Sequence, residues 1–160
     1  MKKIIVLLAL LVTSTIFSQS LVLDISYTRI ENDKNRSTRT ETFSISGSSS
    51  AYSLKYDGRV LPNEMDEQKV CELTQNAVNE IASSVSDNKV AVNETFYAKE
   101  KTNGESTFYL LIKVNMVYDG TPYEIILDGE ANLVMGNKMY NKVTELIKDL
   151  RRIIKNCKIA

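Results

Sequence analysis

Two cysteines are the residues whose type and spacing most directly predict a covalent chemistry. Cys71 and Cys157 are too far apart for a C-x-x-C redox motif, and without any histidine they cannot complete a zinc site. In an oxidising compartment such a pair is expected to form a disulfide, which would stabilise the fold by roughly 4 kcal/mol in the chain-entropy model. The alternative is two buried free thiols, which behave as small hydrophobic side chains. We predict the disulfide.

Residues for catalysis, metal binding and cofactor binding are hard to find in the sequence. With no histidine, Ser-His-Asp and Cys-His catalysis and histidine-ligated metals are excluded. No glycine-rich phosphate-binding motif and no D-x-D-x-D-G calcium loop occurs. The serine-rich segment 47–50 is expected to be a plain loop, because no base for a nucleophilic serine can be named. We therefore assign no catalytic, metal or cofactor-binding residue and expect no cofactor.

The first twenty residues have the pattern of a secretory signal peptide. Met1 is followed by two lysines, residues 4–12 contain no polar side chain, and small and polar residues lead to Ser20. Cleavage fits after Ser18 or after Ser20. A buried strand and a membrane anchor are the alternatives, but the apolar run is too short to span a bilayer. The leader resembles those of exported bacterial proteins, and its Phe-Ser-Gln end resembles leaders of the Bacteroidota, which implies a secreted or periplasmic protein.

The remaining residues, 21–160, are expected to form a single domain. Removing Lys2 and Lys3 leaves 18 basic against 20 acidic residues, a net charge of −2. This balance gives no electrostatic reason to expect binding to nucleic acid or to an anionic membrane. No stretch of about 20 apolar residues follows the leader, so no membrane span is predicted there. The sequence does not specify the oligomeric state.

The most regular part of the domain is a predicted hairpin from Phe108 to Leu127. Even positions from Phe108 to Tyr118 are apolar or aromatic and odd positions are mixed, which is typical of a strand with one buried face. Asp119-Gly120 favours a type I′ turn. A two-residue loop there pairs Met116 with Tyr123, Val114 with Ile125 and Ile112 with Leu127, and pairs Asn115 with Glu124 and Leu111 with Asp128.

The rest of the domain is expected to add four strands and two helices. Alternation predicts strands over 21–30, 41–46, 51–56 and 90–99, with Asp57-Gly58 ending the third. A helix is expected to begin at Pro62-Asn63-Glu64 with Asn63 as its N-cap, and to bury a stripe from Val70 to Val85. Asp128-Gly129-Glu130 follows the hairpin, and residues 131–135 are expected to be irregular. A second helix is expected after Asn137, which can cap it, with a buried stripe from Met139 to Cys157.

The sequence leaves two registers possible between strand 90–99 and the central strand. Asn103-Gly104 predicts a hairpin that joins strand 90–99 to the central strand. A two-residue loop would place Phe96 opposite Leu111, on the more polar face, whereas an odd loop or a bulge would return Phe96 to the face of Leu110.

These elements predict an α+β fold of order βββα-βββα, a two-layer sandwich of an antiparallel sheet of about six strands with two helices on one face. If the helices run antiparallel, Cys71 and Cys157 lie close together.

Two functions fit this fold. The first is a non-catalytic exported domain that binds a partner protein or a small ligand, or serves the cell envelope. Its binding face would be the sheet face away from the helices, including Tyr109, Leu111 and Phe96. The second is a small secreted hydrolase that works with carboxylates alone, which would need two acidic side chains converging in a cleft. We favour the first.

Overall fold

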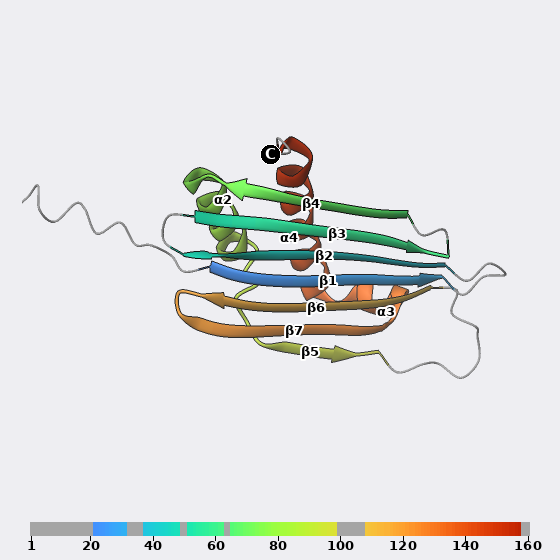
Figure 1. Cartoon of the computed structure of the whole chain (residues 1–160). Coiled ribbons are helices and arrows are strands. Elements are labelled where there is room, and N and C mark those ends of the chain that lie inside the picture. The colour runs from blue at the N-terminus through green and yellow to red at the C-terminus, as the bar shows by residue number, and fades with distance from the viewer. Residues whose placement is uncertain (1–20, 32–36, 49–50, 63–64, 99–107, 158–160) are drawn as a thin grey trace, which may run out of the picture.

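A single mixed sheet of seven strands organises the protein (Figure 1). The computed structural model describes residues 21–31, 37–48, 51–62, 65–98 and 108–157. The strand order across the sheet is β4-β3-β2-β1-β6-β7-β5. The strands are β1 (Leu21–Glu31), β2 (Ser37–Ser48), β3 (Ala51–Leu61), β4 (Met65–Leu73), β5 (Glu94–Tyr97), β6 (Phe108–Tyr118) and β7 (Thr121–Glu130).

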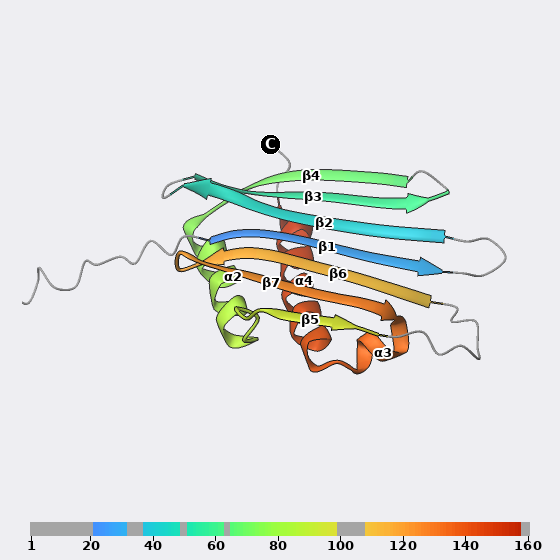
Figure 2. The same ribbon diagram turned by 90° about the horizontal axis from the view of Figure 1, so that it is seen from below.

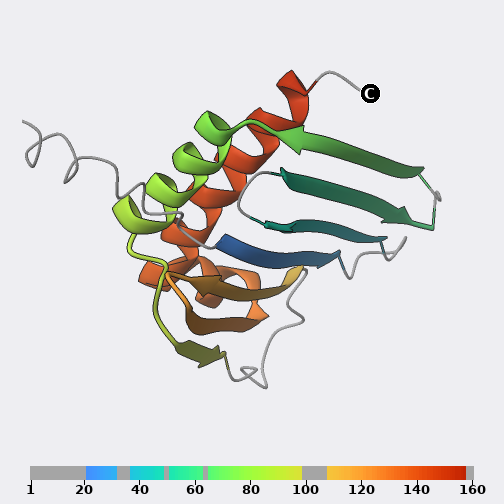
Figure 3. The same cartoon turned by 60° about the vertical axis from the view of Figure 1, so that its left-hand side comes forward.

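In the described part of the chain three helices cover one face of this sheet, and none covers the other face (Figures 2 and 3). They are α2 (Gln75–Asp87), α3 (Ala131–Gly136) and α4 (Lys138–Asn156). The α+β class is therefore confirmed, with one strand and one short helix more than expected. The predicted antiparallel sheet and the order βββα-βββα are wrong, because the sheet is mixed and the order is ββββα-βββαα. No helix in the described part of the chain is long and apolar enough to cross a membrane.

The predicted central hairpin is confirmed in its turn and in its register. Strands β6 and β7 pair so that Ile112 faces Leu127 and Val114 faces Ile125. Asp119 and Gly120 both have positive φ, 50° and 73°, as a type I′ turn requires. The register holds because the even side chains from Leu110 to Met116 are buried under the helices, and a slip of one residue would expose them.

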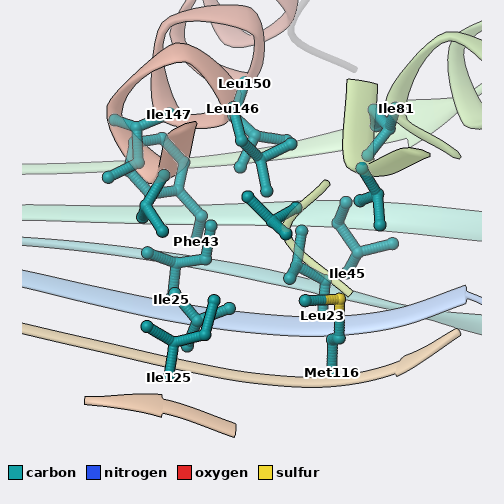
Figure 4. Packing of buried hydrophobic residues seen from close by; sticks show 14 of the residues in the cluster. Leu23, Ile25, Phe43, Ile45, Ile81, Met116, Ile125, Leu146, Ile147 and Leu150 are labelled. Carbon is teal, nitrogen blue, oxygen red and sulfur yellow. The ribbon is translucent and has the colours of Figure 1, made fainter. Parts of the chain in front are cut away.

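The hydrophobic core lies between the sheet and the helices (Figure 4). Helix α4 buries the predicted stripe of apolar side chains at three- and four-residue spacing. Its first turn is capped as predicted, because the side chain of Asn137 accepts a hydrogen bond of 2.7 Å from the backbone N–H of Met139. The largest fully buried side chains include Phe43, Leu23, Ile25, Ile45, Ile81, Ile112, Ile125, Leu127 and Leu146.

The predicted first helix is wrong in its N-terminal half. Residues 65–73 form β4, an edge strand that pairs antiparallel with β3, and α2 begins only at Gln75. Its cap is Thr74, whose hydroxyl accepts from the N–H of Ala77 at 3.3 Å, and Asn63 lies outside the described residues. Val70 points away from the core and is 59% exposed. The apolar residues from Val70 onward have the three- and four-residue spacing of a helix. The strand was not recognised because an edge strand does not need a regular alternation of buried and exposed side chains.

Strands β2 and β3 are longer than predicted. Strand β3 does not end at Asp57-Gly58 but continues to Leu61, and β2 begins at Ser37. The ends of these strands carry polar residues, so their alternation is weak. Backbone pairing with both neighbours holds them in the sheet instead.

Strand β5 does not form the expected hairpin with β6. It lies at the opposite edge of the hairpin and pairs parallel with β7, with Phe96 beside Leu127. Gly129 permits this approach: it has φ +146°, and a Cβ there would lie 2.3 Å from the Cβ of Ala98. The side-chain carbonyl of Asn93 also accepts a hydrogen bond of 2.8 Å from the N–H of Glu124. The Asn103-Gly104 signal lies outside the described residues.

Cys71 on β4 and Cys157 after α4 lie at disulfide distance, with their sulfur atoms 2.11 Å apart. The predicted antiparallel helices bring them together, because the start of α2 lies beside the end of α4. Cys71 belongs to the edge strand, however, and not to the predicted helix. Residues 131–135, expected to be irregular, form most of α3. The predicted leader lies outside the described residues.

Candidate functional site

A cleft lies where the strands extend past the helices. Strands β1 to β4 continue beyond α4, so the helix-side face of the sheet is uncovered at that end (Figure 3). The space between this surface and the C-terminal turns of α4 is a cleft with a volume of about 550 Å³. The cleft is lined by Tyr27, Arg29, Arg39, Glu41, Tyr56, Glu67, Lys69, Arg151, Ile154 and Lys155.

Strand register places the floor of the cleft in one row across the sheet. Tyr27 pairs with Glu41, Glu41 with Gly58, and Gly58 with Glu67. A Cβ on Gly58 would lie 2.5 Å from the hydroxyl of Tyr56, so the missing side chain makes room for that tyrosine over the strand. Tyr56, two residues before Gly58 on β3, thus extends its hydroxyl over the row that contains Glu41 and Glu67.

Glu41 is the buried charge at the centre of this row, and it is only 2% exposed. Arg39 donates to its Oε1 at 2.7 Å, and Arg151 on α4 donates to its Oε2 from Nε at 3.1 Å and also from Nη2. A buried carboxylate needs such partners because desolvating an unpaired charge is costly. Glu41 therefore holds two guanidinium groups at the wall of the cleft, where their side chains are 60% and 46% exposed.

The other charges leave the cleft positive. Lys69 pairs with Glu67 at 2.7 Å, and Arg29 pairs with Glu31 at 2.9 Å at the outer end of β1. Arg29 also stacks over the ring of Phe108, 4.6 Å from its centroid. Lys155 makes no ion pair with any residue that the structure describes. The lining holds five cationic and two anionic side chains, and counting Glu31 still leaves the cations in excess.

Two tyrosines complete the polar surface of the cleft. Burial raises the pKa of Tyr27, and nearby Tyr140 raises it further. Burial also raises the pKa of Tyr56, with the charges of Glu41 and Glu67 adding to the effect. Both phenols therefore stay protonated at neutral pH and can donate hydrogen bonds.

The cleft brings two carboxylates to one surface, as a carboxylate-only hydrolase would require. Both oxygens of Glu41 accept from arginine side chains, however, and its role is to hold these side chains. Glu67 is 58% exposed on its side chain and pairs with Lys69. A general acid of the glycosidase kind needs a desolvated carboxyl that keeps its proton at working pH. Glu41 is desolvated, but arginine side chains bind both of its oxygens, and Glu67 is exposed. No His/Cys/Asp/Glu group suited to a metal occurs among the described residues.

The predicted binding residues are not brought together. Tyr109 and Leu111 lie on the open face of β6, whereas Phe96 lies on the helix side and packs against the core, in register with Leu127. The hydroxyl of Tyr109 donates to Asp128. Toward β1 and β2 this open face is rich in hydroxyl groups, and those of Thr28 and Thr40 lie 3.3 Å apart. The open face also carries a shallow groove of about 470 Å³ at the Val22 end of β1.

Comparison with known proteins identifies no relative of this chain. No family model, curated protein or solved structure matches the chain.

Sequence reasoning missed the cleft, although one signal for it was present. Glu41 has the same parity as Phe43 and Ile45, so it falls on the buried face of its strand. An acidic residue on a core face demands a partner, which here comes from Arg39 and Arg151. Without the tertiary fold, Arg151 was indistinguishable from the other basic residues of the final helix.

Proposed function

We propose that this protein is a non-catalytic binding domain that acts outside the cytoplasm, with the cleft as its ligand site. The observation that carries the proposal is Glu41, a carboxylate buried in the wall of an open cleft that fixes two half-exposed arginines. A buried charge weakens a fold unless it is compensated, and replacing such groups by apolar ones is often neutral or stabilising. The presence of the buried Glu41 carboxylate is better explained if the guanidinium groups that it fixes bind a ligand.

The size and composition of the cleft support the same function. Its volume of about 550 Å³ is within the range of small-molecule sites. Ring surfaces of Tyr27 and Tyr56 and the side chain of Ile154 offer apolar contact, while the arginines and phenols offer directed donors. Binding sites commonly combine such walls with a few fixed polar groups.

Action outside the cytoplasm is supported by two further features. The leader pattern in residues 1–20 predicts export, and the pairing of Cys71 with Cys157 suits an oxidising compartment. A partner protein on the open face near Tyr109 and Leu111 remains a separate prediction.

The proposal is tested by screening the protein against a chemically mixed library of small molecules by NMR, beside assays with chromogenic esters, glycosides and phosphate esters. We expect compounds that shift the resonances of cleft residues and no turnover of the chromogenic substrates. Turnover that disappears in Glu41→Gln or Glu67→Gln would instead establish the hydrolase alternative. Binders found only on the open face would move the site away from the cleft.

A further inference from the structure

The charges of the cleft specify the chemical class of its ligand. Arg39 and Arg151 share a single carboxylate, so their two positive charges are only half neutralised. Each guanidinium carries five N–H donors, and Glu41 occupies one of them on Arg39 and two on Arg151. The remaining donors belong to side chains that line the cleft and are about half exposed.

Lys155 adds a third cation to this pair. It lies in the last turn of α4, one helical turn after Arg151, and lines the same cleft. Since it has no ion-pair partner among the described residues, its charge adds to the half-neutralised arginine pair. Three cations with one shared counter-charge make this part of the cleft selective for anions.

The geometry of the guanidinium donors further narrows the chemical class of the ligand. Guanidinium groups match the oxygen spacing of carboxylates and phosphates, and they bind such oxyanions by paired hydrogen bonds. The protonated phenol of Tyr56 can add a donor to the same anion. The tyrosine rings and Ile154 leave an apolar surface beside the charged end.

From this arrangement we infer that the cleft binds a small organic oxyanion, a carboxylate or phosphate ester that carries an aromatic or apolar body. This inference rests on the proposed function and names the ligand class of the same site. The anionic end lies against Arg39, Arg151 and Lys155, and the apolar body lies against Tyr27 and Tyr56.

Phenyl phosphate and benzoate are suitable probes, with inorganic phosphate, benzyl alcohol and phenyltrimethylammonium for comparison. Titrations followed by NMR of the isotope-labelled protein should show phenyl phosphate or benzoate shifting the cleft resonances. Inorganic phosphate should bind more weakly, because it lacks the apolar body. The neutral and cationic compounds should leave the cleft resonances unchanged.

Variants then test the residues. Arg39→Gln should weaken binding of the anionic probe about tenfold, through loss of a charged hydrogen bond. Lys155→Gln removes a cation that supports no buried acid, so it should fold normally and weaken binding about threefold. Lys148→Gln is the matched control on the same helix. Lys148 pairs with exposed Glu145 outside the cleft, and its replacement should leave the affinity unchanged.

The possible results distinguish a failure of the oxyanion inference from a failure of the proposed binding function. Cleft shifts caused by benzyl alcohol or phenyltrimethylammonium but not by the anions would overturn the oxyanion inference and leave the binding function standing. Equal affinity for inorganic phosphate would overturn the apolar half of the ligand. An absence of cleft shifts with every probe and with the mixed library would overturn both.

Discussion

Glu41 on β2 and Arg151 on α4 are 110 residues apart in the chain, yet the guanidinium Nε of Arg151 donates to the carboxylate at 3.1 Å. This bond ties the final helix to the sheet and forms one wall of the cleft. Because Glu41 is buried and Arg151 is about half exposed, the pair serves both stability and surface chemistry.

Removing Arg151 should therefore destabilise the fold measurably. Arg151→Met leaves Glu41 with Arg39 as its remaining partner, so we expect the free energy of unfolding to fall by about 2 kcal/mol. Arg152→Met is the matched control, since Arg152 pairs with the more exposed Glu80 and Asp149 and should cost less than about 1 kcal/mol. Urea denaturation of both variants measures this difference. Equal losses would show that the burial of Glu41 has no energetic consequence.

The link between Cys71 and Cys157 joins the edge strand to the end of α4, across 86 positions of sequence. Its reduction should lower the free energy of unfolding by roughly 4 kcal/mol in the chain-entropy model. Denaturation with and without a reductant measures the effect, and the Cys71→Ser/Cys157→Ser double variant should not respond to the reductant. Two free thiols in the denatured, unreduced protein would contradict the link.

Gly129 lies where the chain after β5 approaches β7 most closely, beside Ala98. Gly129→Ala places a Cβ against Ala98 at a φ of +146°, so we expect a loss of about 2 kcal/mol and faster amide exchange over 94–98. Gly136→Ala has no atom within 4 Å of the added Cβ and should be neutral or slightly stabilising. Unchanged exchange in Gly129→Ala would mean that β5 does not need this close approach.

The central hairpin was predictable because two independent signals agree on it. Every even position from Phe108 to Tyr118 is apolar or aromatic, and Asp119-Gly120 fixes the turn, so only one register buries the apolar face. Helix α4 was equally clear, since its stripe and the Asn137 cap are local features. In each of these elements the local pattern and the tertiary burial coincide.

The edge strands could not be predicted in the same way. Strand β4 carries charged residues on both faces, because at its outer end it borders the open cleft and not the core. Its position is fixed by hydrogen bonds to β3 and by Cys71, which local patterns do not encode. Strand β5 has four residues and pairs parallel with β7. No turn motif in the sequence predicts this pairing. The cleft exists because these strands extend beyond α4, so it too is a tertiary feature.

The tyrosines of the cleft make stability sensitive to alkaline pH. The pKa of Tyr56 is raised above its ordinary value of 10.0, chiefly by burial, so the folded state favours the neutral phenol. The stabilising contribution is complete below pH 10.0 and is lost as the pH rises through the higher folded pKa. Tyr56→Phe should lose stability less steeply over this range. Identical alkaline profiles, measured by urea denaturation at a series of pH values, would contradict this effect.

A crystal structure with phenyl phosphate would show whether the cleft beside Glu41 holds the oxyanion of a ligand. We expect phosphate oxygens within hydrogen-bond distance of Arg39 and Arg151, with the phenyl ring beside Tyr27 or Tyr56. Phenyl phosphate bound instead to the open face near Tyr109 and Leu111, with the cleft empty, would contradict it.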